Sequence, residues 1–402
     1  VLTSTIDFSA LKCDTINTER LASAHPANAC IKETTFMKRN SYGFIGLGLI
    51  GGSIAKAIRK IQPDCHILVY DTNANMTQNA LSEGIADAVT DSIGNDFHSC
   101  DMIFLCAPVS VNNENLAQLK PYLAPDTLLT DVGSVKSSIH AKVKELGLER
   151  QFIGGHPMAG SEKSGFDNAN PIILENAFYI LTPTESSSEE NLTFYRDLVQ
   201  AIGAIPLVIT CDKHDYVTAA ISHVPHLIAA ALVNLVHDHD TKEGTMKLVA
   251  AGGFKDITRI ASSSPQMWES ICMTNSRNIA DLLDDYIESL QDISQAVRYR
   301  KQGYAYDLFT ESKEYRDSFA NQSRGPIKKV FGCYLDIPDE AGAIATIATL
   351  LAKADISIKN IGIVHNREFE EGVLQVEFYE QASLDEAITL LQDLNYTVYE
   401  RK

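Results

Sequence analysis

The sequence lacks the cysteine spacing of a secreted or zinc-binding protein. None of its eight cysteines forms a CxxC pair, which argues against a disulfide framework and against a zinc site, and favours a reducing, cytoplasmic location. Basic residues are also few: 34 Lys and Arg stand against 52 Asp and Glu, so the net charge is −18. This charge argues against nonspecific nucleic-acid binding, and an anionic ligand therefore needs a locally positive pocket.

No apolar run near the start of the sequence resembles a signal peptide. Residues 1–36 are polar and contain acidic side chains, so we expect no transit peptide there but a disordered or weakly attached leader. One uncharged stretch, residues 216–236, is long enough to span a membrane. Because it contains two histidines, a proline and a serine, we expect instead a buried helix in a helical core, with no membrane partner.

The pattern of apolar residues changes twice along the 402-residue chain, which is long enough for two or three domains. Up to 209, short apolar runs alternate with helical stretches, which predicts βαβ units on a mainly parallel sheet. The expected strands lie in YGFIGLG, HILVYD, MIFLCAP, TLLTDVGS, FIGGH, FYILTP and AIPLVIT. Over 210–318 only helical patterns remain, and after a polar linker at 318–329 a small βαββαβ unit follows. We therefore expect domains at 37–209, 210–318 and 327–402.

A glycine motif follows the first expected strand and begins the first expected helix. Gly46 permits a tight turn, Gly48 lets a pyrophosphate approach the backbone, and Gly51 allows close helix–strand packing. Asp71 ends the second strand, where a carboxylate suits the ribose hydroxyls of NAD and repels the 2′-phosphate of NADP. The alternative is a glycine-rich turn that binds no nucleotide. We expect a Rossmann-type NAD site, whose further contacts are Leu49, Ile50, Ala107, Pro108 and Asp131.

A histidine and a serine are the candidates for catalysis. TDVGSVK and FIGGH both end strands, so Ser134 and His156 should emerge at the same sheet edge as the glycine turn. An imidazole titrates near neutral pH and suits the proton that leaves a carbinol as its hydride departs. The alternatives are a helix N-cap role for Ser134 and a purely structural role for His156.

The helical part contributes polar candidates of its own. His223 and His226 are three residues apart on one face of the apolar helix. A metal site would lack a third ligand nearby, so we expect no metal. One of the two histidines should instead donate a hydrogen bond to an anionic ligand. Arg259 is the natural clamp for a carboxylate, although a structural ion pair with Asp256 remains an alternative. Core packing or an interface is the expected role of Trp268, the single tryptophan.

Taken in order, the motifs GLGLIGGS, DVGSVK, GGHPMAGSEKSG, SHVPH and AAGGFKDITRIA…PQMW resemble the prephenate dehydrogenase family of tyrosine biosynthesis, over about residues 42–310. The resemblance implies an NAD-dependent oxidoreductase that is a homodimer through its helical domain. The small-molecule substrate it implies is prephenate or arogenate, because the family contains enzymes for either. A second class of function, a non-catalytic sensor of NAD and an amino acid, stays open.

The resemblance also implies roles for single residues. His156 would polarise the ring 4-hydroxyl of the substrate with help from Ser134, and Arg259 would bind a carboxylate with His226 nearby. The remaining positions it implies are Glu162, which shapes or gates the pocket, Asp256, which orients Arg259, and Trp268, which reaches the site from the other subunit.

The last unit resembles an ACT domain, a ferredoxin-like module that commonly binds amino acids. DIPDEAGAIATI matches its first strand, loop and helix, and KNIG lies on the following strand. The implied effector site contains Asp339, Gly342 and Asn360. We expect this unit to bind tyrosine or a related amino acid and to regulate the dehydrogenase.

Overall fold

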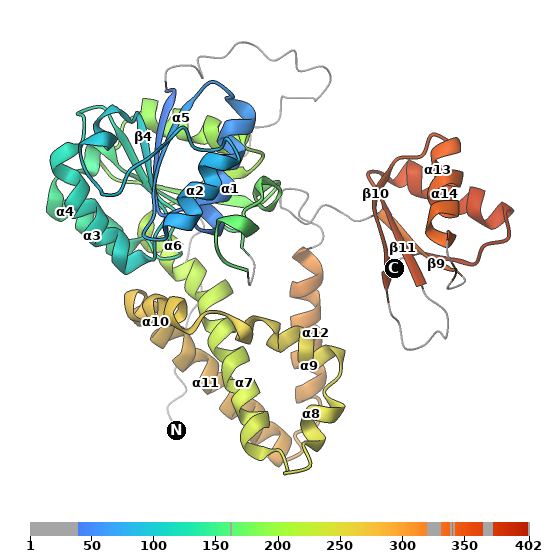
Figure 1. Ribbon diagram of the computed structural model, residues 1–402. Helices are drawn as coiled ribbons and strands as arrows, with labels where there is room; N and C mark the ends of the chain where they lie inside the picture. Colours follow the sequence, from blue (N-terminus) through green and yellow to red (C-terminus); the bar gives the residue numbers. More distant parts are fainter. Residues whose placement is uncertain are drawn as a thin grey trace.

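The computed structural model describes residues 39–160, 163–319, 331–337, 340, 342–364 and 373–400. Figure 1 shows three parts in chain order: two β-sheets with helices around them, a group of helices, and a small sheet with two helices. The predicted fold class is confirmed. The expected leader, 1–36, and most of the linker lie outside the described residues.

The first sheet is parallel throughout and has the strand order β3-β2-β1-β4-β5. Its strands are β1 (Ser41–Ile45), β2 (His66–Tyr70), β3 (Ala88–Val89), β4 (Met102–Leu105) and β5 (Leu128–Asp131). The connecting elements are α1 (Leu49–Ile61), α2 (Ala74–Ser82), the short 3₁₀ helix η4 (Asn95–Ser99), α3 (Val109–Leu119) and α4 (Ser137–Leu146). The order reverses on either side of β1, which is where open α/β sheets bind ligands.

A second sheet continues from β5 and adds one antiparallel pair to the mainly parallel arrangement that we expected. It contains β6 (Ile153–Pro157), β7 (Phe178–Pro183) and β8 (Ile205–Val208), with α5 (Glu189–Ala201) between β7 and β8. Strand β6 runs antiparallel to β7, and β7 runs parallel to β8. A parallel bridge between Leu129 and Phe152 aligns β6 with β5. The carboxyl end of β6 therefore reaches the same edge as the first sheet.

Helices cover both faces of the first sheet, which leaves the strand ends for a ligand. Successive β4 residues point to opposite faces: Phe104 belongs to the apolar cluster that contains Ile54 of α1, and Ile103 belongs to the cluster that contains Leu116 of α3. The rings of Phe44 and Phe104 stack with centroids 4.8 Å apart. Burial on both faces explains why these strands are uniformly apolar in sequence.

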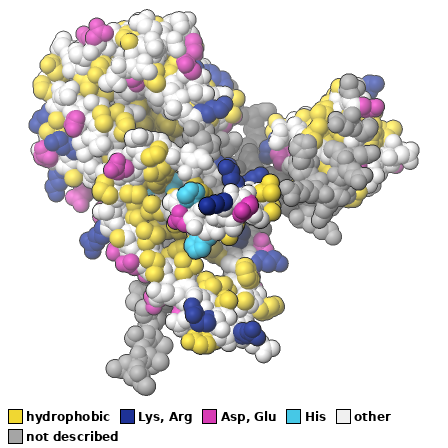
Figure 2. Space-filling model, turned by 60° about the horizontal axis from the view of Figure 1, so that its bottom comes forward, with side chains coloured by type: hydrophobic (Ala, Val, Ile, Leu, Met, Phe, Trp, Pro, Cys, Tyr) yellow, Lys and Arg dark blue, Asp and Glu magenta, His cyan; other side chains and the backbone are white. Residues whose placement is uncertain are grey.

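Among its described residues, the second part contains helices and no strand, as predicted. It contains α6 (Cys211–Thr218), a π-helical turn (Ala219–His223), α7 (Val224–His239), α8 (Thr245–Val249), α9 (Gly252–Thr258), η10 (Arg259–Ser262), α10 (Pro265–Thr274), α11 (Ser276–Arg298) and α12 (Tyr304–Ser318). Its buried core is small, consisting of Ala219, Val224 and Ile279 with partly buried neighbours. Much apolar surface stays exposed, including Leu248 (83%) and Phe309 (72%) (Figure 2).

The expectation of a buried helix over 216–236 is wrong for the single chain. The continuous helix Cys211–His239 is apolar and long enough to cross a membrane, yet only 22% of its most apolar window is buried. The sequence pattern identified the helix correctly but could not show what covers it. A second copy of the chain could cover this helix, because an exposed apolar surface of this extent is characteristic of a protein interface.

The third part confirms the βαββαβ prediction. It contains β9 (Phe331–Asp336), α13 (Ala343–Lys353), β10 (Ile358–Val364), β11 (Val373–Phe378), α14 (Gln381–Asp393) and β12 (Val398–Glu400), and its antiparallel sheet has the order β10-β11-β9-β12. Gly342 precedes α13 with φ +98°, a conformation that other residues rarely adopt. Asn360 is exposed beside a register shift in β10. Asp339 lies outside the described residues.

Candidate active site

The glycine turn between β1 and α1 has the geometry of a nucleotide-binding loop. Gly46 has φ +92°, and a Cβ there would lie 2.8 Å from the Ala107 amide nitrogen. A Cβ on Gly51 would lie 2.7 Å from the Gly46 carbonyl oxygen, so α1 packs directly on the turn. A Cβ on Gly48 would meet nothing within 4 Å. The turn is therefore closed toward the protein and open at Gly48, which fits a dinucleotide phosphate at the helix N-terminus.

The ends of β2 and β4 complete this edge. Asp71, directly after β2, accepts a hydrogen bond of 2.6 Å from the Leu47 amide, so its carboxylate lies against the glycine turn. After β4, Asn112 holds the loop through Ala107: its side-chain amide donates to the Ala107 carbonyl at 2.8 Å, and its side-chain oxygen accepts from the Ala107 amide at 3.1 Å. Leu49 and Ile50 begin α1, and Pro108 precedes α3. Sequence reasoning missed Asn112, which belongs to no recognised motif.

Asp131 is placed differently from the cofactor contact that we expected. Its carboxylate is 1% exposed and forms an ion pair with Lys136, which is itself completely buried. The Lys136 ammonium also donates to the Gly155 carbonyl at 2.7 Å, next to His156. Asp131 thus holds the loop and β6 together, and its carboxylate is turned inward. The sequence offered no signal for Lys136, because lysines are rarely buried.

His156 on β6 is the half-buried imidazole that the sequence predicted at this edge, and two residues of α6 hold it. Its Nδ1 lies 2.8 Å from Nε2 of His214, and Nδ1 of His214 lies 2.8 Å from Oδ1 of Asp215. His214 is completely buried and Asp215 is 1% exposed. Sequence reasoning missed both, because HD in KHDY follows no catalytic spacing and approaches His156 only through the fold.

The electrostatics of these three hydrogen-bonded residues, Asp215, His214 and His156, favour an uncharged His156. Burial, followed by the nearby His214, Lys136 and His223, lowers the pKa of His156 well below its ordinary value. Burial of Asp215 alone would raise the pKa of its carboxyl group, but hydrogen bonds, the largest from His214, keep this pKa below its ordinary value. His156 therefore stays uncharged at neutral pH while Asp215 stays ionised.

Ser134 is partly buried in the loop before α4, and the alternative reading of it as a helix N-cap is wrong. Helix α4 begins at Ser137, and its first amides are bound by Asp215: Oδ1 accepts from the Lys136 amide at 2.7 Å and Oδ2 from the Ser137 amide at 2.8 Å. Because Ser134 does not cap the helix, its hydroxyl remains a candidate for contact with the substrate or with His156.

A second cluster lies where the first turn of α7 meets α10. The rings of His226 and Trp268 stack with centroids 4.0 Å apart. Within one chain Trp268 already contacts this cluster, and its expected contact with the site of the other subunit stays a prediction. His226 donates from Nδ1 to the Ser222 carbonyl at 2.8 Å, so its Nε2 can donate to an anion only when the ring is protonated. Burial is the main reason why the pKa of His226 is lowered.

The remaining predicted residues are partly placed. Arg259 begins η10 directly after α9, which carries Asp256, and both side chains are exposed; Arg259 is close enough to His226 to influence its pKa. Glu162 lies outside the described residues. Among the residues that the structure describes, no group of three or more His, Cys, Asp and Glu side chains is placed to hold a metal ion.

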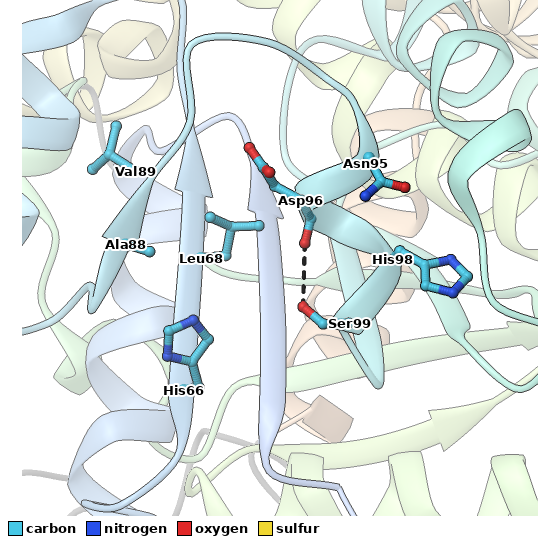
Figure 3. Close-up of a pocket in the computed structure, with 8 residues that line it drawn as sticks. All are labelled: His66, Leu68, Ala88, Val89, Asn95, Asp96, His98 and Ser99. Carbon is cyan, nitrogen blue, oxygen red and sulfur yellow. Dashed lines mark hydrogen bonds between the residues drawn. The ribbon is translucent and has the colours of Figure 1, made fainter.

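A hollow of about 550 Å³ lies elsewhere on the first domain and contains none of the predicted site residues (Figure 3). It opens beside the amino-terminal part of β2, between β3 and η4. Its lining consists of His66, Leu68, Ala88, Val89, Asn95, Asp96, His98 and Ser99. Asp96 already accepts a hydrogen bond of 2.7 Å from Thr90, and the carboxyl ends of the strands lie at the opposite edge. We therefore keep the glycine turn and His156 as the candidate active site.

Comparisons with known proteins identify the family of the chain. The family model "Prephenate dehydrogenase, nucleotide-binding domain" matches residues 54–208, and "Prephenate dehydrogenase, dimerization domain" matches residues 210–311. The prephenate dehydrogenase of Bacillus subtilis is 38% identical over 335 residues, which cover 83% of this chain and 90% of that protein. That of Lactococcus lactis is 35% identical over 352 residues, covering 87% of this chain and 96% of that protein.

Solved structures give the same result. Prephenate dehydrogenase from Aquifex aeolicus, in complex with hydroxyphenyl propionate and NAD+, is 32% identical with a TM-score of 0.66, covering 69% of this chain and 97% of that chain. Arogenate dehydrogenase from Synechocystis is 28% identical with a TM-score of 0.62, covering 69% of this chain and 99% of that chain. By sequence and by fold, the chain belongs to the prephenate dehydrogenase family.

Proposed function

We propose that this chain catalyses the oxidative decarboxylation of prephenate with NAD+, which yields 4-hydroxyphenylpyruvate, CO2 and NADH. Membership of the family supports the reaction class. The observation that carries the proposal is the imidazole of His156, held by His214 at the same sheet edge as the open glycine turn. This arrangement offers a proton acceptor beside a dinucleotide site, which is what oxidation of a carbinol requires.

In this reaction His156 transfers the proton of the substrate 4-hydroxyl. When bound, NAD+ takes the hydride that leaves C4 of the substrate. Nε2 of His156 accepts the 4-hydroxyl proton as the C4–O bond gains double-bond character. The bond to the ring carboxylate then breaks, its electron pair stays in the ring, and His156 returns the proton to the phenol oxygen. Because aromatisation drives the step, a neutral base of low pKa is sufficient.

NAD+ is the cofactor, and the geometry of this sheet edge supports a set of residues that bind it. We assign the pyrophosphate to the turn Gly46–Gly51, with Leu49 and Ile50 at the helix N-terminus. The Asp71 carboxylate, fixed against the turn, suits the adenine ribose and repels a 2′-phosphate. Ala107 and Pro108 form the neighbouring wall, which Asn112 keeps in place.

The substrate is a dianion, and the helical part supplies its cation. We assign one carboxylate to Arg259, with His226 as a second contact and Asp256 and Glu162 as supporting residues. We keep Ser134 as the partner of His156 or of the substrate hydroxyl. On a chain of net charge −18, such a local cation is needed to hold an anion.

The exposed apolar helices and the match to a dimerization domain support a homodimer. The same pairing explains the apolar helix Cys211–His239 without a membrane, and we infer a cytoplasmic enzyme. Sedimentation of the chain as a monomer at micromolar concentration, or its recovery in the membrane fraction, would contradict this part of the proposal.

NADH formation with prephenate or arogenate tests the function directly. We expect turnover with prephenate and a kcat roughly 10²–10⁴-fold lower in the His156→Asn variant, whose NAD+ affinity should be unchanged. Turnover with arogenate alone would make the chain an arogenate dehydrogenase, a function that 28% identity to the Synechocystis enzyme leaves open. NAD+ binding without turnover of either substrate would make it a sensor.

We further propose that the βαββαβ unit binds tyrosine or a related amino acid and inhibits the dehydrogenase. The open backbone at Gly342 and the exposed side chain of Asn360 support this. Tyrosine titrated into the full chain should lower the rate of NADH formation, and Asn360→Ala should weaken that inhibition. Equal inhibition of both proteins would place the inhibitor elsewhere.

A further inference from the structure

Three side chains from two parts of the chain form a continuous row of hydrogen bonds that ends at the proposed base. Asp215 and His214 lie on α6, the first helix of the helical part, and His156 lies on β6. The two contacts between them are each 2.8 Å, and the two α6 side chains have no access to solvent beyond 1%. The hydrogens of such a row can be arranged in only a few ways, and the groups that bind Asp215 select one arrangement.

The direction of the row is fixed at Asp215. Its carboxylate is an acceptor only, and it is already bound by the backbone amides of Lys136 and Ser137 at 2.7 and 2.8 Å. The hydrogen between it and His214 must therefore sit on His214 Nδ1. Since a neutral imidazole carries one N–H, Nε2 of His214 is an acceptor. The hydrogen of the next contact must then sit on Nδ1 of His156.

We propose that His214 and Asp215 are positioning residues that hold His156 as the Nδ1–H tautomer, so that its bare Nε2 faces the substrate hydroxyl. This inference rests on the proposed function for the role of Nε2, but the tautomer itself does not depend on it. An unrestrained neutral imidazole exchanges between both tautomers, and the Nε2–H form could only donate to the hydroxyl. The row removes that unproductive form.

The row is itself anchored, which makes the selection rigid. The Thr218 hydroxyl donates to the His214 carbonyl at 2.9 Å, and the Asn275 side chain donates to the Asp215 carbonyl at 2.8 Å from the start of α11. Asp215 also accepts from the Ser137 hydroxyl. The carboxylate therefore has neither a free lone pair facing water nor room to rotate, and both rings inherit its orientation.

The test replaces His214 in the full-length enzyme. His214→Phe keeps a buried aromatic ring and removes both hydrogen bonds, so we expect kcat to fall roughly 10–100-fold, as is typical when a supporting partner is lost, with a smaller change in KM for prephenate. His214→Gln can donate to Asp215 and accept from His156, and it should recover part of kcat. The matched control is His140→Phe, a partly buried histidine that bonds Thr182 at 2.9 Å outside the row; its kcat should stay close to that of the wild type.

Nitrogen-15 NMR of histidine-labelled enzyme without substrate gives the decisive readout. We expect His156 to show a protonated Nδ1 and a bare Nε2 in the wild type and in His214→Gln, and both tautomers in His214→Phe. A protonated Nε2 in the wild type, or an unchanged kcat in a folded His214→Phe, would overturn the proposal. If His214→Phe does not fold, the wild-type and His214→Gln spectra still decide. If the tautomer is as expected but no NADH forms from prephenate, the proposed function fails and the positioning role stands.

Discussion

Replacing Lys136 with methionine should lower the free energy of unfolding by more than breaking an exposed ion pair on the surface does. Lys136 is completely buried, its partner Asp131 is 1% exposed, and its ammonium also serves the Gly155 carbonyl. Methionine fills similar space but leaves a buried carboxylate whose other donor within 3.0 Å is the Gly133 amide. Removing one partner of a buried pair costs about 3–5 kcal/mol, and we expect a loss in this range.

Urea unfolding followed by far-ultraviolet circular dichroism measures the loss, and hydrogen exchange of segment 152–157 assigns it to β6. The control is Lys142→Met, which breaks the exposed pair of Lys142 and Glu145. That pair should be worth less than about 1 kcal/mol because water and salt screen it. The double variant Asp131→Asn, Lys136→Met should recover much of the loss, since a neutral pair leaves no buried charge.

Two results would refute this reasoning. A loss below about 1 kcal/mol in Lys136→Met would mean that the Asp131 carboxylate is compensated without the ammonium, contrary to the cost of an unpaired buried charge. No recovery in the double variant would mean that the cost comes from the Gly155 carbonyl or from packing. In either case Lys136 would not be the electrostatic support of β6.

Three further predictions concern the site itself. Gly48→Ala should leave the melting temperature unchanged, because its Cβ meets nothing within 4 Å, and it should weaken NAD+ binding in a titration. Gly51→Ala should instead lower stability by about 1–3 kcal/mol, because its Cβ meets the Gly46 carbonyl oxygen at 2.7 Å. His156→Asn should lower kcat roughly 10²–10⁴-fold with less change in KM. The pKa of His156 is lowered, mainly by burial, and the base is inactivated only when it is protonated. The acid limb of the kcat/KM profile should therefore lie well below pH 6.5. Arg259→Ala should raise the KM for prephenate by an amount on the order of 2–4 kcal/mol, with kcat less affected.

Local patterns in the sequence were sufficient for most of the fold. Each predicted strand of the first domain is present, because strands buried on both faces are apolar runs bounded by turn residues. Strand β3, with only Ala88 and Val89, was missed because two residues carry no periodicity. The antiparallel pairing of β6 with β7 was also missed, since strand direction depends on long-range pairing that no local pattern records.

The candidate site divides in the same way. The glycine turn and His156 are recognisable because their backbone requirements are local. His214, Asp215 and Lys136 belong to the site only because α6 packs against α4 and β6, and their types are unremarkable where they stand in the sequence. Asp131 shows the converse error: a carboxylate at the end of a strand was expected to face the cofactor, but a buried lysine five residues later turns it inward.

The row from Asp215 to His156 also explains why the base sits at the junction of two parts. Asp215 binds the first amides of α4 in the nucleotide-binding part, while Asn275 of α11 holds its backbone in the helical part. The helical part buries little core within one chain, and the homodimer proposed above would add packing to it. His156 is held by α6, which is anchored in both parts of the chain, so we expect the orientation of the proton acceptor to respond to the packing of the helical part.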